Sequence, residues 1–317
     1  MDFRLLGTTG LRVSRIAFGA GPIPAVMTSG AAADRVAVLR RAIDQGINWI
    51  DTAASYGAGQ SESSIGESLA QLGAHDVMQI ATKFRVVGDD FENLEAAIRQ
   101  SLSESMARLR TRRIALLQLH NAITWQRDSE PSSVSVDDVL RPGGVADVLE
   151  RLRSDESIGA VGLTGTGEAS AVREVISSGR FQTIQAPYNL LNPSAGQTMS
   201  DDFSETNYGN LFAECTRRSM GVFAIRVYAG GALAGQPPSS HTLQTRYFPL
   251  ALYQRDQARA EAWRRRLAIQ GIDLKEAAVR FALQHPAVTS AIIGLSTPAQ
   301  VDQAVQCLTP RDEPPEA

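Results

Sequence analysis

The feature that most constrains the fold is an alternation of short apolar runs with amphipathic segments along nearly the whole chain. Eight runs have the length and composition of buried strands, and apolar residues recur at helical spacing between them. These runs are residues 15–18, 47–50, 77–82, 114–119, 158–163, 181–184, 222–225 and 288–293. Eight strand–helix units without a break in composition favour one α/β (β/α)8 TIM barrel over an open, doubly wound sheet. No GxGxxG motif follows the first strand, so the usual dinucleotide fingerprint is absent.

The ends of the chain are predicted to differ from this repeating pattern. Residues 3–6 and 11–14 flank a glycine-bounded turn, 7–10, and are expected to form an N-terminal β-hairpin. The closing segment is acidic and contains proline, which favours a frayed tail. The sequence therefore predicts a single barrel domain over residues 1–308 and a frayed C-terminal tail over 309–317.

Two stretches between predicted elements have the character of long loops. One is the polar, serine-rich segment 121–141, and the other is 226–255. Loops at the active-site face of a barrel set specificity, so Trp125 and His241 could each line the substrate pocket or simply lie in solvent. Trp49, on a strand, is expected to fill the barrel.

Polar residues stand at or just beyond the ends of five predicted strands. They are Asp51, Lys83, His120, Thr164 and Gln185. The strands of a (β/α)8 barrel all end at one face, and the active sites of such barrels are built there. We therefore expect these side chains to meet at the mouth of the barrel.

The two-residue period of a strand sharpens this expectation. Lys83 shares one side of its strand with Ala81, and His120 shares one side with Gln118. Leu119 points to the opposite side, toward the helices. The titratable groups are therefore predicted to converge inside the barrel mouth and not to scatter over its outer surface.

A phenol completes this group, because Tyr56 follows Asp51 by five residues in a stretch that closes into a glycine turn. A free tyrosine has a pKa of about 10 and exchanges protons poorly near neutrality. An ammonium such as that of Lys83 stabilises a neighbouring phenolate, and a carboxylate keeps the ammonium charged and in place. His120 could hydrogen-bond the reacting carbonyl or share the proton. The four groups together suit carbonyl reduction with a hydride supplied from elsewhere.

The order and spacing of these residues resemble the catalytic tetrad of the aldo-keto reductase family. The matching pieces are Asp51-Thr52-Ala53-x-x-Tyr56-Gly57, Ala81-Thr82-Lys83 and Leu119-His120. The resemblance covers nearly the whole chain, from the hairpin to Ile293-Gly294. Thr164-Gly165 is similar to the sugar-dehydrogenase-like branch, which includes L-galactose and D-threo-aldose dehydrogenases.

The resemblance implies an NAD(P)H cofactor lying extended across the barrel mouth. It also implies hydride transfer that interconverts an alcohol with an aldehyde, ketone or aldose. Tyr56 would act as general acid or base, Asp51 and Lys83 would tune it, and His120 would orient the substrate.

A set of cofactor contacts is implied in the same way. It comprises Gly19, Thr164, Gly165, Gln185, Arg226, Gly294, Ser296 and Gln300. Thr164 and Gly165 stand where the family usually has a Ser-Asn pair on the carboxamide, and Gln185 matches the family's glutamine. The aromatic residue that stacks on the nicotinamide in the family falls within 225–228, where the sequence singles out no one residue.

The choice of cofactor is predicted from two departures from the family pattern. Gly294 and Gln300 stand where NADPH-specific members have a lysine and an arginine. A 2′-phosphate carries about two negative charges and favours a guanidinium fork. The sequence therefore favours NAD or dual use, unless Arg226 supplies the missing positive charge.

Other classes of function find little support. A net charge of −3 with scattered basic residues indicates neither a nucleic-acid footprint nor a basic membrane patch. No signal-peptide pattern or long apolar run is present, so a cytoplasmic location is expected. Cys215 and Cys307 lack metal-ligand spacing, so no metal site is predicted and both are expected to be reduced bystanders. The expected partner is a small carbonyl compound or sugar, and the oligomeric state is not indicated.

Two alternative functions stay open at this level. A barrel of this type could be a nucleotide-sensing binding subunit with little turnover, although a complete tetrad favours an enzyme. Lys83 could instead form a Schiff base in an aldolase barrel, which borohydride trapping would detect.

Overall fold

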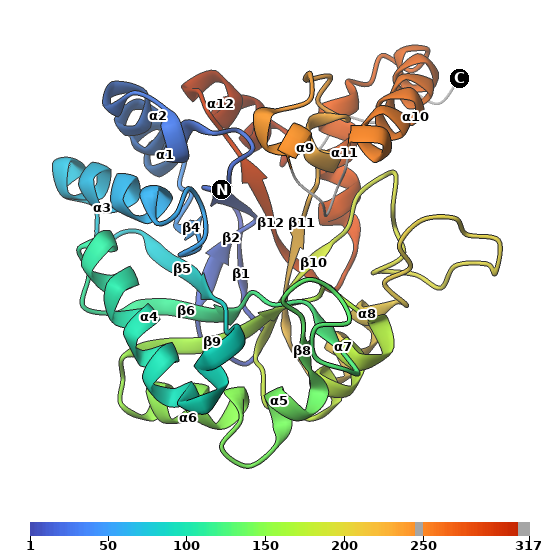
Figure 1. Cartoon of the computed structure of the whole chain (residues 1–317). Coiled ribbons are helices and arrows are strands. Elements are labelled where there is room, and N and C mark those ends of the chain that lie inside the picture. The colour runs from blue at the N-terminus through green and yellow to red at the C-terminus, as the bar shows by residue number, and fades with distance from the viewer. Residues whose placement is uncertain (245–249, 310–317) are drawn as a thin grey trace.

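The computed structural model describes residues 1–244 and 250–309 and contains the predicted parallel barrel (Figure 1). The strands pair around the closed barrel in the order β3-β4-β5-β6-β9-β10-β11-β12, so barrel strands that follow one another in the chain are also neighbours in space. Their bounds are β3 (Ile16–Gly19), β4 (Trp49–Asp51), β5 (Gln79–Phe84), β6 (Ile114–Leu119), β9 (Ile158–Thr164), β10 (Thr183–Pro187), β11 (Gly221–Ile225) and β12 (Val288–Gly294). The predicted fold class, a (β/α)8 TIM barrel, is confirmed.

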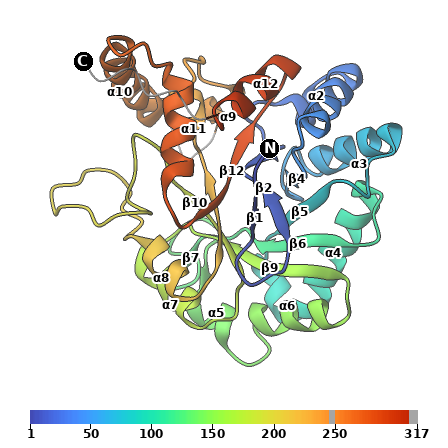
Figure 2. The same ribbon diagram turned by 180° about the vertical axis from the view of Figure 1, so that it is seen from behind.

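Helices form a ring outside the strands, and each barrel strand is followed by a helix that packs back onto the sheet (Figures 1 and 2). These helices are α2 (Ala32–Asp44), α3 (Gln60–Leu72), α4 (Leu94–Leu109), α6 (Val145–Ser154), α7 (Ala169–Ser177), α8 (Leu211–Arg217), α11 (Leu274–Gln284) and α12 (Pro298–Gln306). Two short insertions, α1 (Val26–Ser29) and the 3-10 helix η1 (Gly88–Glu92), follow β3 and β5. None of the helices in residues 1–244 and 250–309 combines the length and apolar content needed to cross a lipid bilayer.

The predicted hairpin, β1 (Phe3–Leu5) with β2 (Arg12–Ser14), is also present. Leu6 and Val13 are fully buried in the apolar cluster that fills the barrel. Gly7 has φ of +52°, and a Cβ there would lie 2.2 Å from the backbone nitrogen of Gly221 at the start of β11. The hairpin therefore closes the amino-terminal end of the barrel, and the other end is left for the site.

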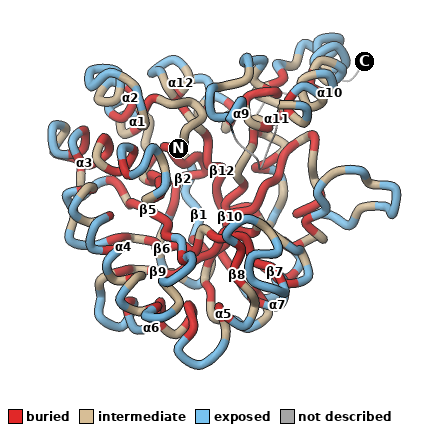
Figure 3. Tube along the Cα trace, in the orientation of Figure 1, coloured by how far each residue is buried: buried red, intermediate tan, exposed pale blue. Residues whose placement is uncertain are grey.

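Side chains alternate between the barrel interior and the helix layer as predicted. Ala81 and Leu116 belong to the interior cluster, whereas Leu119 lies in the larger core between strands and helices. Trp49 is fully buried inside the barrel with its ring 5.3 Å from that of Phe223, so its predicted filling role is confirmed. Figure 3 shows this burial as mostly red along the central strands.

The strands that carry Asp51 and Lys83 begin and end later than predicted. β4 runs through Asp51, and β5 runs through Lys83 to Phe84. The reason is pairing with the neighbouring strand: Asp51 is in register with Ala81, and Lys83 is in register with Gln118. These functional side chains therefore stand on paired backbone, which holds them more rigidly than a loop would.

The prediction of a long loop over 121–141 was wrong in part. This segment contains the paired strands β7 (Ile123–Thr124) and β8 (Val134–Ser135) and the helix α5 (Val136–Leu140). The helix begins with a capping box, because Ser135 Oγ accepts from the Asp138 amide at 3.0 Å and the Asp138 carboxylate accepts from the Ser135 amide at 2.9 Å.

The prediction of a long loop over 226–255 was wrong in part. The segment contains the 3-10 helix η2 (Ala229–Gly231) and α9 (Ser240–Gln244), and α10 (Leu250–Ala268) begins within it. The Tyr253 hydroxyl donates to the Gln236 carbonyl at 2.5 Å, which ties α10 to the segment before α9. Residues 245–249 of this predicted loop, and 310–317 of the predicted tail, lie outside the described residues.

Candidate active site

The four predicted catalytic residues come together at the open end of the barrel. Asp51 ends β4, Lys83 lies near the end of β5 and His120 follows β6, while the turn after β4 brings in Tyr56. Lys83 Nζ donates to Asp51 Oδ2 at 2.6 Å, to the Thr52 carbonyl at 2.8 Å and to Tyr56 Oη at 3.2 Å. The ammonium therefore links the carboxylate to the phenol.

Lys83 is held as a buried cation. Its side chain is 1% exposed and that of Asp51 is 5% exposed. Burial alone lowers the pKa of Lys83, but the charge of Asp51 and the contact with Tyr56 outweigh it, so this pKa lies above its usual value. A fixed positive charge beside a phenol favours the phenolate when a proton leaves.

His120 has the opposite character. Its Nδ1 lies 3.3 Å from Ser55 Oγ, and its ring meets that of Tyr56 edge to face with centroids 5.6 Å apart. Burial, and then the positive charges of Lys83 and Arg85, hold the pKa of His120 well below its usual range. The imidazole is therefore neutral near neutrality and can donate one N–H without carrying charge.

The neutral state of His120 leads to a pH prediction. We expect kcat/KM to show no histidine ionisation between about pH 6 and 8, where an ordinary imidazole titrates. An inflection near 6.5 that His120→Gln removes would contradict this. Stability should also depend on pH: the unfolded chain binds a proton at His120 near pH 6.5 and the folded chain does not. This contribution is therefore complete above about pH 6.5 and is lost as pH falls below it.

Two glutamines hold the second oxygen of Asp51. Gln185 Nε2, on β10, donates to Asp51 Oδ1, and Gln118 Nε2, on β6, lies 3.4 Å from the same atom. Gln185 was predicted as a cofactor contact. Gln118 was not predicted as a site residue. The available signal was its position two residues before His120, on the same side of the strand.

A further set of contacts supports the site from α3. Ser61 Oγ donates to the Ala20 carbonyl and pairs with Thr52 Oγ1, both at 2.8 Å. Glu62, which is fully buried, accepts from Thr82 Oγ1 at 2.5 Å and from Arg108 Nε at 2.7 Å. The start of α3 therefore fixes the ends of the strands that carry Asp51 and Lys83, a role that the sequence analysis did not identify.

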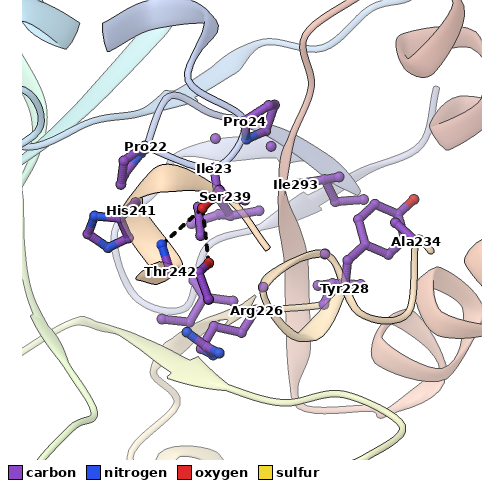
Figure 4. Close-up of a pocket in the computed structure, with 18 of the residues that line it drawn as sticks. Pro22, Ile23, Pro24, Arg226, Tyr228, Ala234, Ser239, His241, Thr242 and Ile293 are labelled. Atoms are coloured by element: carbon purple, nitrogen blue, oxygen red, sulfur yellow. Dashed lines mark hydrogen bonds between the residues drawn. The ribbon is translucent and has the colours of Figure 1, made fainter. Parts of the chain in front are cut away.

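A cavity of about 1550 Å³ opens from the tetrad and continues past the end of β12 to α12, where Gln303 and Gln306 line it. Pockets for one small molecule measure about 300–1,000 Å³, so this cavity has room for more than one such ligand. Figure 4 shows part of its wall, with the Pro22–Pro24 segment on one side and Arg226 on the other. Ser239 and Thr242 of the α9 region also line it, and Ser239 Oγ lies 2.9 Å from Thr242 Oγ1.

Most of the predicted cofactor residues line this cavity: Gly19, Thr164, Gln185, Arg226, Gly294, Ser296 and Gln300. Gly165 does not. A Cβ at Gly165 would lie 2.8 Å from Ile184 Cδ1, so Ile184 occupies the space that a larger residue would need. The contact expected at Gly165 stays a prediction, and Thr166 lines the cavity.

The sequence left open whether His241 and Trp125 line the substrate pocket, and the two residues differ in this respect. His241 lines the cavity (Figure 4). Trp125 is half exposed, donates to Ser170 Oγ at 2.9 Å and is not among the lining residues. Both cysteines are free and buried, and Cys307 reaches the cavity wall near α12, where burial raises its pKa to about 11. Within the described ranges, no group of three or more His, Cys, Asp or Glu side chains is placed to hold a metal ion.

Comparison with known proteins decides the family. A model of the Aldo/keto reductase family matches residues 15–312. The chain belongs to the aldo/keto reductase family. It is therefore an oxidoreductase, and the predicted resemblance is confirmed.

Relatives of both predicted kinds match over most of the chain. L-galactose dehydrogenase from Arabidopsis thaliana is 24% identical over 98% of this chain and 88% of its own length. D-threo-aldose 1-dehydrogenase from a Pseudomonas species is 26% identical over 93% of this chain and 89% of its own. The predicted sugar-dehydrogenase-like branch is thus represented among its relatives.

Solved structures share the barrel. The holo form of an aldo-keto reductase from Bacillus halodurans superposes with a TM-score of 0.73 at 22% identity, covering 98% of this chain and 92% of that one. A glycerol dehydrogenase from Gluconobacter oxydans has a TM-score of 0.68 at 25% identity, covering 97% and 90%. At these identities the likeness shows a shared fold.

Proposed function

We propose that this aldo-keto reductase uses NAD(P)H to interconvert a carbonyl compound and an alcohol, with Tyr56 as the proton donor and acceptor. The observation that carries the proposal is the contact of Lys83 Nζ with both Tyr56 Oη and Asp51 Oδ2. A phenol beside a buried, ion-paired ammonium can give up a proton at low cost and take it back.

In the reducing direction, Tyr56 Oη gives its proton to the carbonyl oxygen, and Lys83 stabilises the phenolate that results. The neutral imidazole of His120 offers an N–H to the same oxygen and orients it. When bound, the cofactor supplies the hydride that reaches the carbonyl carbon, and in oxidation it accepts one. The ion pair with Asp51 keeps Lys83 from losing its own proton during the transfer.

The lining residues fit a nicotinamide group. Thr164 Oγ1 donates to the Leu119 carbonyl at 2.8 Å, and Gln185 Nε2 donates to Asp51, so both side chains keep acceptor oxygens for the N–H₂ of a carboxamide. Ile225, at the end of β11, lies on the same side of its strand as the interior residue Phe223 and lines the cavity. We assign Ile225 the position over the nicotinamide ring.

The geometry also bears on the Schiff-base alternative. A lysine that attacks a carbonyl must be neutral, whereas the pKa of Lys83 is raised. Its three N–H bonds are directed to Asp51, Thr52 and Tyr56. Both observations favour a tuning role over a nucleophilic one.

The direct test is a spectrophotometric screen at 340 nm in both directions with both cofactors. Because two relatives are named for sugars, aldoses such as L-galactose are included beside simple aldehydes. Cofactor-dependent turnover of any of them supports the proposal. Tight cofactor binding without turnover of any compound would favour the nucleotide-sensing alternative.

We propose that NADH binds at least as tightly as NADPH. A Cβ at Gly294 would lie 2.3 Å from the Ile23 carbonyl oxygen, so a lysine cannot enter there without moving that segment. Gln300 Oε1 accepts from the Ser296 amide at 2.8 Å and from Ser296 Oγ at 2.9 Å, so this loop presents no cation. Titration of each reduced cofactor against its own fluorescence measures the two affinities, and clearly tighter NADPH would refute the assignment.

A single substitution should change this preference. Gln300→Arg is expected to tighten NADPH binding by about tenfold with little change for NADH, because a guanidinium pairs with the 2′-phosphate. Gly294→Lys, at the sterically closed position, should weaken both cofactors.

A further inference from the structure

The catalytic end of the cavity contains a guanidinium with no partner among the described residues, that of Arg85. Arg85 directly follows β5 and lines the cavity together with Tyr56 and His120. Strand alternation places it on the same side as Lys83, whereas Phe84 packs into the outer core. Within residues 1–244 and 250–309, its side chain makes no hydrogen bond or ion pair.

Two carboxylates close to Arg85 in the sequence or in the cavity wall form no ion pair with it. Asp90, five residues further on, accepts from the Val87 amide at 2.8 Å. Glu130 also lines the cavity, but no ion pair within 4.0 Å joins it to Arg85, and its charge acts on Tyr208. In another part of the barrel, by contrast, the buried carboxylate of Glu62 forms an ion pair with Arg108. Arg85 is thus a cation whose charge the surrounding protein does not neutralise.

The positive charge of Arg85 acts electrostatically on His120. It is one of the causes, after burial and Lys83, that hold the pKa of His120 low. The remaining wall near the tetrad includes the uncharged residues Ala122, Pro187 and Ile225. A neutral substrate would leave this guanidinium to water, whereas an anionic group would pair with it.

We propose that the substrate of the oxidoreductase carries a carboxylate or phosphate group, and that Arg85 binds this group while the carbonyl lies at Tyr56 and His120. A guanidinium presents a planar fork of N–H donors that matches both anions, so it selects for charge and for orientation. Arg85 is then a specificity-determining residue. This inference rests on the proposed carbonyl–alcohol function.

The test compares anionic carbonyl compounds with neutral ones of similar size. The pairs are succinic semialdehyde with butanal, and glyceraldehyde 3-phosphate with glyceraldehyde. We expect kcat/KM of the unaltered enzyme to be at least about tenfold higher for the anionic member of one pair, and that pair identifies the anion as carboxylate or phosphate.

Substitutions of Arg85 then locate the effect. Arg85→Gln should lower kcat/KM for the preferred anion by about tenfold, mainly through KM, and leave the neutral compound within about twofold. Arg85→Lys keeps the positive charge but lacks the planar fork of donors. Its kcat/KM for the anion should lie between those of the unaltered enzyme and Arg85→Gln. Arg112→Gln is the matched control, because Arg112 is also exposed but precedes β6 at the opposite end of the barrel. It should change neither value.

Each outcome is decisive. Equal kcat/KM for anionic and neutral compounds overturns the inference and leaves the proposed function standing. A preference for the anion that survives in Arg85→Gln also overturns it, because the anion then binds elsewhere. Failure of all four compounds in an enzyme that turns over neutral compounds of the wider screen also overturns the inference and leaves the proposed function standing. Failure of every compound in both screens with both cofactors contradicts the proposed function and with it the inference.

Discussion

Tyr56→Phe is expected to lower kcat by about 10²–10⁴-fold, the range that a positioned general acid contributes. The ring would keep its edge-to-face contact with His120, and only the hydroxyl that receives the bond from Lys83 Nζ would be lost. Cofactor affinity should stay nearly unchanged. Steady-state kinetics and a fluorescence titration of reduced cofactor measure the two effects on the same preparation.

The matched control is Tyr188→Phe. Tyr188 packs against Phe212 and Phe281, and it is not among the residues that line the cavity. This variant should keep full turnover. If Tyr56→Phe retained full turnover as well, the proton would have to come from another group and the mechanism would be wrong.

Lys83→Met is expected to cost about 3–5 kcal/mol of folding free energy and to abolish measurable turnover, because it leaves the carboxylate of Asp51 buried without its cation. Asp51→Asn should be destabilising for the converse reason. The ion pair is 2.6 Å long, and both side chains are almost completely buried. Urea unfolding followed by circular dichroism measures the change in stability.

The double variant Asp51→Asn/Lys83→Met separates stability from catalysis. With both charges removed, the penalty of an unpaired buried charge disappears, so stability should recover in large part. Turnover should not recover, since no ammonium remains beside Tyr56. Additive losses of stability would show that the pair is not energetically coupled in the folded protein.

The fold could be predicted from local periodicity, whereas the catalytic tetrad was predicted from the order and spacing of its residues, which resemble those of the aldo-keto reductase family. Short apolar runs, separated by segments with helical spacing, predict eight strands that alternate with helices. Parallel strands end at one face, so Asp51, Lys83 and His120 could be placed together without any tertiary information. The later start and end of β4 and β5 were missed because only pairing with the neighbouring strand shows where a strand begins and stops.

The loops were predicted less well, because their structure depends on single contacts. The capping box at Ser135 makes a helix within a segment that is polar and serine-rich overall. The bond from Tyr253 to the Gln236 carbonyl joins residues 17 positions apart. Neither contact leaves a periodic signal in the sequence.

The sequence by itself determined the barrel, the placement of Asp51, Lys83 and His120 at its open end, and the lack of basic residues at Gly294 and Gln300. Only the tertiary structure decided that Ile184 fills the space beside Gly165, that the Ile23 carbonyl closes the space beside Gly294, and that Arg85 has no partner among the described residues. The physical reason is the distance along the chain between the residues that interact. Periodicity is a property of neighbours along the chain, whereas packing and charge pairing depend on which distant segments meet.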